Sequence, residues 1–275
     1  MGTGMVHNLL LNEYDVNILA HKNRAPIDRL VSSGAKELYS LKDIARQSDI
    51  VILCLPNSET VKVVLTKIIS DLENDTLLID CTTNSVEAVN QLQARAVSGR
   101  IRYAEAPLTG GQLQAETAAL GAIVGCARED FEEIKTVLGP CCQTIERFGD
   151  IGSGAKAKLI SNFLALGTAT LVVEAMKAAR DFEVDWEKFY KLASQGSGHS
   201  MSLDRIAPKA INGEYDSYVF SIANTLKDLS YIRDIFEAEQ DYGKMAQLLF
   251  DIYQQSNSEG NSEQFLSSRL QPRDL

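Results

Sequence analysis

The sequence predicts a doubly wound α/β sheet followed by an all-α domain. Short runs rich in Val, Ile and Leu alternate with helix-like segments through the first half of the chain, whereas the second half shows helical spacing only. The turn-rich tract 148–154 separates the two patterns and is typical of a domain boundary. We therefore expect one domain over residues 1–151 and a second over residues 152–275.

The strand-like runs are apolar without alternation, which suits strands buried on both faces of a parallel sheet. The run at 49–55, for example, is Asp-Ile-Val-Ile-Leu-Cys-Leu. A polar or turn residue follows each early run, and a segment with helical spacing follows that turn. The sequence predicts strands at 15–20, 49–55, 75–80, 100–105, 119–125 and 142–147, and helices at 25–33, 41–47, 58–70, 85–97 and 128–138.

The second domain is predicted to begin with a long helix, 153–181, in which apolar residues recur at helical spacing. Its most apolar part, 163–176, contains Gly167 and Glu174 and is too short to span a bilayer, so we expect a buried helix. The tail after Gln254 is polar and is expected to be weakly ordered, although its Phe265 and Leu266 could dock on the domain. Further helices are predicted at 186–194, 200–211, 220–239 and 241–255.

Composition narrows the class of protein. The 275 residues are 45% hydrophobic and 23% charged, as in ordinary globular domains. A net charge of −10 argues against a nucleic-acid partner and against a polybasic membrane contact. The five cysteines are odd in number and include no Cys-x-x-Cys pair. The chain does not open with a basic segment followed by an apolar one, so no signal peptide is expected. We therefore expect reduced cysteines that act as packing residues, and a cytoplasmic location.

Six short motifs occur in order along the chain, and together they resemble the β-hydroxyacid dehydrogenase family. This family includes 3-hydroxyisobutyrate dehydrogenase and tartronate semialdehyde reductase. The segment 105–111 (Glu-Ala-Pro-Leu-Thr-Gly-Gly) stands where the family has Asp-Ala-Pro-Val-Ser-Gly-Gly, and 152–162 matches its Gly-x-Gly-x-x-x-Lys-x-x-x-Asn. The other matches are Leu55-Pro56, 80–83 (Asp-Cys-Thr-Thr), 115–120 (Ala-Glu-Thr-Ala-Ala-Leu), and Phe220 with Lys227-Asp228-Leu229.

The beginning of the chain also resembles the family, but only in part. Residues 1–10 match the family from its third glycine, which is Gly2 here, whereas the family opens with a strand and two earlier glycines. That turn and the following helix N-terminus hold the pyrophosphate of a dinucleotide. The expected fold class is therefore an N-terminally truncated, Rossmann-like α/β domain followed by an all-α domain. We expect the first strand to lie upstream of Met1.

Lys158 and Asn162 lie at i and i+4 on one helical face, which lets both side chains serve one site. The alternative for Lys158 is an ordinary solvated lysine, and that for Asn162 is a polar residue satisfied inside a helix bundle. The resemblance implies that Lys158 is the general acid/base and that Asn162 hydrogen-bonds the reacting oxygen. It also implies a substrate-carboxylate site with free backbone amides at Thr109, Gly110 and Gly111.

The resemblance implies a nicotinamide cofactor. An acidic residue after the second strand is typical of NAD enzymes, but this chain has the basic cluster His21, Lys22 and Arg24 and no acid there. Such a cluster suits a 2′-phosphate and favours NADP(H); the alternative is a solvated loop in an NAD enzyme. The other cofactor-binding residues that the resemblance implies are Gly2, Thr3, Leu55, Pro56, Thr83 and Lys227.

The histidines give weaker signals. His199 lies in a loop that resembles a substrate-facing segment, but a plain surface position explains it equally well. No histidine shows metal-ligand spacing with a cysteine or carboxylate cluster, so no metal is expected.

The sequence therefore predicts an NADP(H)-dependent oxidoreductase that interconverts a small β-hydroxyacid and its semialdehyde by hydride transfer. A homodimer or higher homo-oligomer is expected from the resemblance and from the apolar long helix. The alternative is a catalytically impaired or non-catalytic dimeric scaffold, which would follow if the first strand is truly missing.

Overall fold

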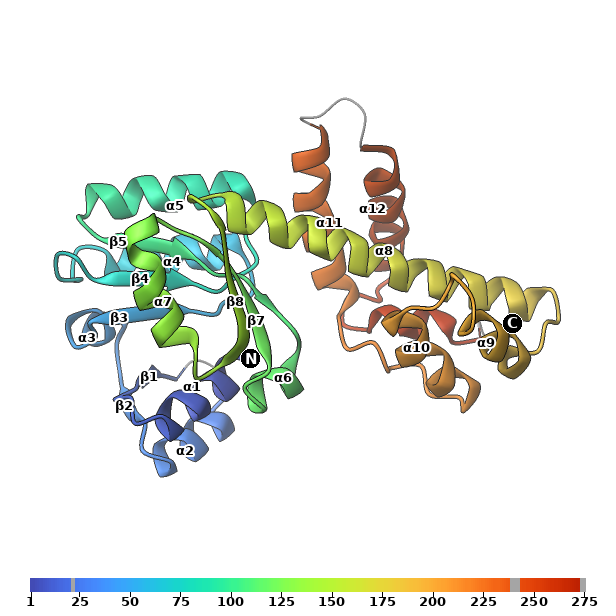
Figure 1. The fold of residues 1–275 in the computed structure, drawn as a ribbon, viewed down its shortest axis with the longest axis horizontal. Coiled ribbons are helices and arrows are strands. Elements are labelled where there is room, and N and C mark those ends of the chain that lie inside the picture. The colour runs from blue at the N-terminus through green and yellow to red at the C-terminus, as the bar shows by residue number, and fades with distance from the viewer. Residues whose placement is uncertain (21–22, 238–242, 273–275) are drawn as a thin grey trace. The chain divides into compact units, whose positions relative to one another are not determined.

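The computed structural model of the protein describes residues 1–20, 23–237 and 243–272 (Figure 1). It divides into two compact units, Met1–Lys158 and Leu159–Leu275, of which the first is α/β and the second helical. The sequence places the boundary between residues 151 and 152, ahead of the long helix α8 (Ser153–Asp181). The compact division falls later because the first turn of α8 packs within the first unit.

A six-stranded sheet forms the centre of the first unit. Three neighbouring strands are parallel, in the order β3, β4 and β5, with Ile50 opposite Leu77 and Leu77 opposite Arg102. β7 then pairs antiparallel with β5 and β6, so the sheet is mixed rather than parallel throughout. The strands are β3 (Ile50–Leu53), β4 (Leu77–Asp80), β5 (Arg102–Glu105), β6 (Leu108–Thr109), β7 (Leu120–Gly125) and β8 (Cys142–Gly149), the last parallel to β7.

Helices cover both faces of this sheet (Figure 1). Leu77 and Ile79 of β4 enter one core with α1, α6 and α7, whereas Leu78 enters the other with α4 and α5. All three side chains are fully buried, as the unbroken apolar run predicts. The helices are α1 (Gly2–Leu11), α2 (Ala25–Ser32), α3 (Leu41–Arg46), α4 (Ser58–Ile68), α5 (Val86–Ser98), α6 (Gln112–Glu116) and α7 (Phe131–Leu138).

Three helix starts are fixed by side-chain caps, which satisfy backbone amides that have no partner within the helix. Ser40 caps α3, Asn57 caps α4 and Ser85 caps α5, and each side chain accepts the N–H of the third helical residue. The caps of α4 and α5 follow β3 and β4. These caps therefore fix where the loops at the carboxyl edge of the sheet end and the helices begin.

A second, two-stranded sheet holds β1 (Asn17–Leu19) and β2 (Lys36–Leu38), which are parallel. Ile18, Leu30 and Ala35 form its small core under α2. The sequence did not predict β2, because it has three residues and only one of them is buried. The expectation of a further strand upstream of Met1 stays a prediction.

In the described residues of the second unit every named element is a helix, and Ser221 and Phe265 form an isolated antiparallel bridge. The part of α8 that belongs to it buries Leu159, Val173 and Met176 completely. Leu266 and Leu270 of the short 3₁₀ helix η2 (Leu266–Leu270) are also fully buried. The expectation of a weakly ordered tail is therefore wrong through residue 272, whereas the expectation that Leu266 could dock is confirmed. The other helices are α9 (Trp186–Ala193), α10 (Met201–Ile211), α11 (Ile222–Glu237) and α12 (Gly243–Ser258).

The cysteines agree with roles in packing, whereas the apolar helix α8 is buried on one face only: Leu164 and Leu171 are exposed, so the expectation of a buried helix is only partly confirmed. Cys81, Cys126, Cys141 and Cys142 are buried and Cys54 is partly buried, and all five are free thiols. Within the described residues, α8 is the one helix long and apolar enough to cross a membrane by length and composition alone. Core helices of soluble proteins meet the same criteria.

Candidate active site

The loops that follow β3 and β4 are tied together at the carboxyl edge of the sheet. The Leu55 N–H donates to Thr82 Oγ1 at 3.1 Å, and Thr83 lies next to that contact, partly exposed. Burial raises the pKa of the Cys54 thiol, and a hydrogen bond from the Gly2 backbone opposes that rise. The start of α1 therefore lies beside the end of β3, where ligands bind in open α/β sheets.

The first turn of α1 has the shape that a phosphate group needs. The N-cap residue, Met1, offers no side-chain acceptor to the first amides of α1, although the Gly2 N–H contacts the Cys54 sulfur. A Cβ added at Gly2 would meet no atom within 4 Å, whereas one at Gly4 would lie 2.6 Å from the carbonyl carbon of Ala115. Open space at Gly2 and an uncapped, positive helix end fit the pyrophosphate of a dinucleotide. Thr3 is exposed on the same turn.

Asp80 shapes the turn that carries Thr83. It is fully buried, and its carboxylate accepts the Thr82 N–H at 3.0 Å, Asn84 Nδ2 at 2.7 Å and the Tyr103 hydroxyl at 3.3 Å. Burial raises the pKa of Asp80 to about 6, although these bonds oppose the rise. Asn84 Oδ1 is buried without a hydrogen-bond partner among the described residues.

The raised pKa of Asp80 predicts that the protein loses stability as the pH rises. The folded state binds this proton more tightly than the unfolded chain, so the stabilisation is complete below about pH 4 and lost through about pH 6. The raised pKa of Asp80 corresponds to roughly 3 kcal/mol in the free energy of unfolding. Urea unfolding at several pH values measures it. The slope between pH 4 and 6.5 should fall in Asp80→Asn, and an equal slope in both proteins would contradict the assignment.

Arg24, which lies between β1 and α2, is paired with two carboxylates. Its guanidinium donates to Glu37 at 2.8 Å through Nη2, forms a second contact with Glu37 through Nη1, and donates to Asp28 at 2.8 Å. Two carboxylates therefore offset the positive charge that the sequence predicts for a 2′-phosphate. His21 and Lys22 lie outside the described residues.

The predicted carboxylate site at 109–111 is only partly available. Gly110 has φ +102°, a conformation that favours glycine, and Thr109 lines a groove of about 360 Å³ beside β7 and β8. The Gly111 N–H, however, donates to Gln114 Oε1 at 2.9 Å, because Gln114 reaches back over the start of α6. The expectation that every amide of this turn is free is therefore wrong at Gly111.

Lys158 and Asn162 lie one turn apart on α8, as the spacing predicts. Lys158 is 9% exposed, whereas Lys156 is exposed, which agrees with their different helical faces. Asn162 Nδ2 donates to Asp228 Oδ2 at 2.6 Å. Lys227, predicted to bind cofactor, places its ammonium 2.9 Å from Asp228 Oδ1. The buried carboxylate of Asp228 thus holds both Asn162 and Lys227, a role that the motif alone did not reveal.

Two further predictions concern His199 and Pro56. His199 Nε2 lies 2.7 Å from Asp204 Oδ2, and both side chains are about half exposed, so a substrate contact for His199 stays a prediction. Pro56 directly follows Leu55 in the loop after β3. No group of three or more His, Cys, Asp or Glu side chains suited to a metal occurs among the described residues.

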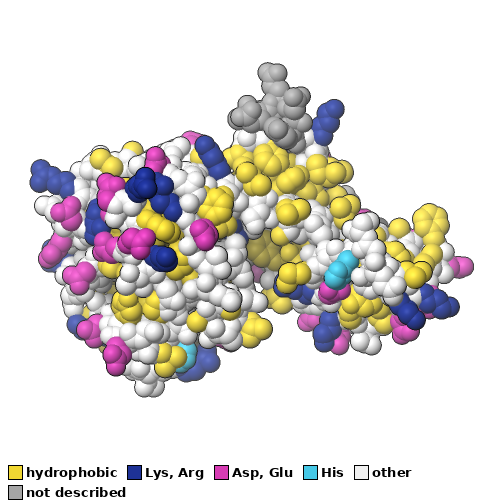
Figure 2. Space-filling view, in the orientation of Figure 1, with side chains coloured by type: hydrophobic (Ala, Val, Ile, Leu, Met, Phe, Trp, Pro, Cys, Tyr) yellow, Lys and Arg dark blue, Asp and Glu magenta, His cyan; other side chains and the backbone are white. Residues whose placement is uncertain are grey.

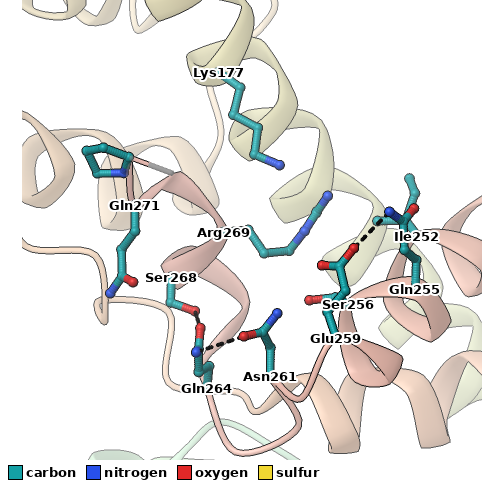
Figure 3. Close-up of a pocket in the computed structure, with 11 residues that line it drawn as sticks. Lys177, Ile252, Gln255, Ser256, Glu259, Asn261, Gln264, Ser268, Arg269 and Gln271 are labelled. Carbon is teal, nitrogen blue, oxygen red and sulfur yellow. Dashed lines mark hydrogen bonds between the residues drawn. The ribbon is translucent and has the colours of Figure 1, made fainter. Parts of the chain in front are cut away.

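A polar pocket of about 310 Å³ lies within the second unit (Figure 3). Lys177 and Arg269 both line it, and Glu174 pairs with them at 3.2 Å and 2.7 Å, so the cationic charge is offset. None of the predicted site residues lines this pocket. We therefore assign it no part in the reaction. Its other polar lining residues are Gln255, Ser256, Glu259, Asn261, Gln264, Ser268 and Gln271.

Two protein-family models match this chain, one over each of its two units. A family model of the NAD-binding domain of 6-phosphogluconate dehydrogenase matches residues 1–149. A second, the NAD-binding region of NADP-dependent 3-hydroxyisobutyrate dehydrogenase, matches residues 152–271.

Individual relatives are similar over most of their length. The mitochondrial 3-hydroxyisobutyrate dehydrogenase of Drosophila melanogaster is 27% identical over 92% of this chain and 80% of its own. The 3-hydroxyisobutyrate dehydrogenase of Pseudomonas aeruginosa is 27% identical over 97% and 93%. A Mycobacterium tuberculosis 3-hydroxyisobutyrate dehydrogenase structure with L-serine shares the fold, with TM-score 0.87, 23% identity and coverage of 98% and 94%. The chain therefore belongs to the β-hydroxyacid dehydrogenase family.

Proposed function

We propose that this protein is an NADP(H)-dependent oxidoreductase that interconverts a small β-hydroxyacid and its semialdehyde by hydride transfer. The observation that carries the proposal is the nearly buried Lys158, one helical turn before Asn162, in a chain whose two units both match NAD-binding family models. A lysine withdrawn from water beside a carboxamide can exchange a proton with a substrate oxygen. Cytoplasmic location is part of the same proposal.

The cofactor, when bound, supplies or accepts the hydride. In the reduction, the Lys158 ammonium donates a proton from Nζ to the aldehyde oxygen, and in the oxidation the neutral amine takes the hydroxyl proton back. The low exposure of Lys158 strengthens its attraction to a developing oxyanion. Asp228 holds one N–H of Asn162 and so orients the carboxamide, whose second N–H remains to hydrogen-bond the same oxygen.

The proposed substrate carries a carboxylate. The Thr109 hydroxyl and the Gly110 amide are the groups of the predicted carboxylate site that this proposal uses, with Gly111 supplying the turn. Two relatives are named 3-hydroxyisobutyrate dehydrogenase, and another is named 2-(hydroxymethyl)glutarate dehydrogenase. These names support a small hydroxyacid substrate.

The proposed cofactor is NADP(H), with His21, Lys22 and Arg24 around the 2′-phosphate. Arg24→Ala should weaken NADPH binding about tenfold and leave NADH binding within about twofold, because only NADPH carries the group that Arg24 would contact. Glu37 already holds the guanidinium, which limits the loss. Fluorescence titration with each cofactor measures both constants.

Arg29→Ala is the matched control for Arg24→Ala, since Arg29 is exposed on the same helix and the substitution removes the same charge. Equal losses for NADPH and NADH in Arg24→Ala, or the same loss in Arg29→Ala, would contradict this phosphate site.

The proposed assembly is a homodimer. Ile160, Leu164 and Leu171 are 54%, 71% and 66% exposed and share one face of α8, and Figure 2 shows apolar side chains gathered on the helical unit. An exposed apolar stripe of this kind is typical of an interface. Light scattering should give about twice the chain mass of 30.2 kDa, and Leu164→Glu should reduce it to one chain. A monomer at all concentrations would contradict the assembly.

The activity itself is tested by NADPH oxidation with a panel of small carboxylate-bearing semialdehydes. We expect turnover with at least one of them and slower turnover with NADH. Absence of cofactor binding together with a stable dimer would instead support the alternative, a non-catalytic scaffold.

A further inference from the structure

Glu105, the last residue of β5, reaches the start of α8. The residue is 1% exposed. Its Oε1 accepts the N–H of Gly152 at 2.6 Å and of Gly154 at 2.9 Å, and its Oε2 accepts the N–H of Ala155 at 3.1 Å. The first amides of a helix have no partner within the helix, so this carboxylate satisfies buried groups that would otherwise be unpaired.

The neighbouring backbone leaves room for this one side chain. A Cβ on Gly125 of β7 would overlap Glu105 Oε1. A Cβ on Gly154 would lie 2.8 Å from the Ile123 carbonyl oxygen and 2.9 Å from the Gly125 nitrogen. The backbones of β7 and α8 therefore meet closely, with the Glu105 carboxylate between them. The positive end of the α8 dipole favours a carboxylate at this point.

Burial of the Glu105 carboxylate costs free energy, and such a cost is typical of a residue with a functional role. Burial raises the pKa of Glu105 to about 7, and its three amide bonds together oppose the rise; the nearby Asp80 carboxylate raises it further. Strongly perturbed buried acids are concentrated at functional sites. Glu105 is also one methylene longer than the aspartate of the family pattern.

We propose that Glu105 is a positioning residue for Lys158. Its carboxylate fixes the first turn of α8, and Lys158 lies three residues beyond the last amide it holds. The direction in which the Lys158 side chain leaves the helix is therefore set by the bond between β5 and α8. The inference rests on the proposed role of Lys158 and adds a residue that need touch neither substrate nor cofactor.

Amide hydrogen exchange of the unmodified protein tests the anchor directly. First-turn amides of a helix ordinarily exchange quickly, because they lack intrahelical acceptors. We expect the Gly154 and Ala155 amides to be protected at least about 100-fold relative to an unstructured chain. Exchange of both amides at the unstructured rate would overturn the proposal without any variant.

Glu105→Gln tests the consequence for Lys158. Glutamine has nearly the same side-chain size as glutamate, but it lacks the negative charge and one of the two acceptor oxygens. In competitive acetylation read by mass spectrometry, Lys158 should react at least about fivefold faster than in the parent protein, while exposed Lys156 stays within about twofold. Unchanged Lys158 reactivity in a folded variant that has lost amide protection would refute the positioning role.

Kinetics then separate this inference from the proposed function. Glu105→Gln should lower kcat about tenfold with the NADPH dissociation constant unchanged, as misplacement of a proton donor predicts. If the parent protein reduces no semialdehyde, the proposed function fails, yet exchange and acetylation still decide whether Glu105 positions Lys158. An equal loss in kcat and in NADPH affinity would indicate general disruption and would overturn the proposal.

Discussion

Lys158→Ala should lower kcat for semialdehyde reduction by about 10²–10⁴-fold, the range lost when a positioned acid/base group is removed. NADPH should bind within about threefold of its normal affinity, because every proposed cofactor residue lies outside α8: in the segment after β1, in the loops after β3 and β4, at the start of α1, or, for Lys227, on α11. Steady-state kinetics and fluorescence titration of the same preparation give both quantities.

Two matched variants sharpen that experiment. Lys156→Ala removes the same charge from an exposed position two residues earlier and should leave kcat within about twofold. Lys158→Arg keeps a positive charge but cannot release its proton, so it should be nearly as slow as Lys158→Ala. Full activity in Lys158→Arg would show that the site needs a charge rather than a proton donor, and the proposed mechanism would be wrong.

Gly4→Ala should destabilise the protein by about 2 kcal/mol, even though alanine favours a helix. The added Cβ would lie 2.6 Å from the carbonyl carbon and oxygen of Ala115, which are backbone atoms that a rotamer change cannot move. Asn8 Nδ2 also donates to the Ala115 oxygen at 2.8 Å, so α1 and α6 cannot separate without losing that bond. Urea unfolding measures the change.

Gly2→Ala is the matched substitution for Gly4→Ala in the same helix. Its Cβ would meet nothing within 4 Å, so the free energy of unfolding should stay within about 0.5 kcal/mol. The methyl group would, however, occupy the space proposed for the pyrophosphate, and NADPH affinity should fall about tenfold. Wild-type affinity in Gly2→Ala would place the phosphates elsewhere.

Much of the fold follows from the sequence because several central strands, such as β4 and β7, are largely buried on both faces. The run at 75–80 has apolar side chains toward both cores, and β4 is found there with no exposed residue. The sequence gives no such signal for β6, which has two residues, or for α6, which has five. These short elements are formed by pairing with β7 and by packing against α1, which are contacts between distant segments.

The sequence identified the candidate site residues one by one, but it did not identify the carboxylates that hydrogen-bond them. The family motif singled out Lys158, which is buried, and not Lys156, which lies two residues earlier and is exposed. The carboxylates that hold the site lie far along the chain: Glu37 is 13 residues from Arg24, Glu105 is 47 from Gly152, and Asp228 is 66 from Asn162. No local pattern encodes such pairs. They arise from the topology that brings strand ends and helix starts together.

The central claim is most directly tested by following NADPH fluorescence with the protein in excess, first alone and then after addition of a small carboxylate-bearing semialdehyde. The account predicts an enhanced signal on binding at micromolar NADPH, followed by its loss as the hydride is transferred. An enhanced signal that no semialdehyde abolishes, or no enhancement at all, would contradict an NADPH-dependent reductase.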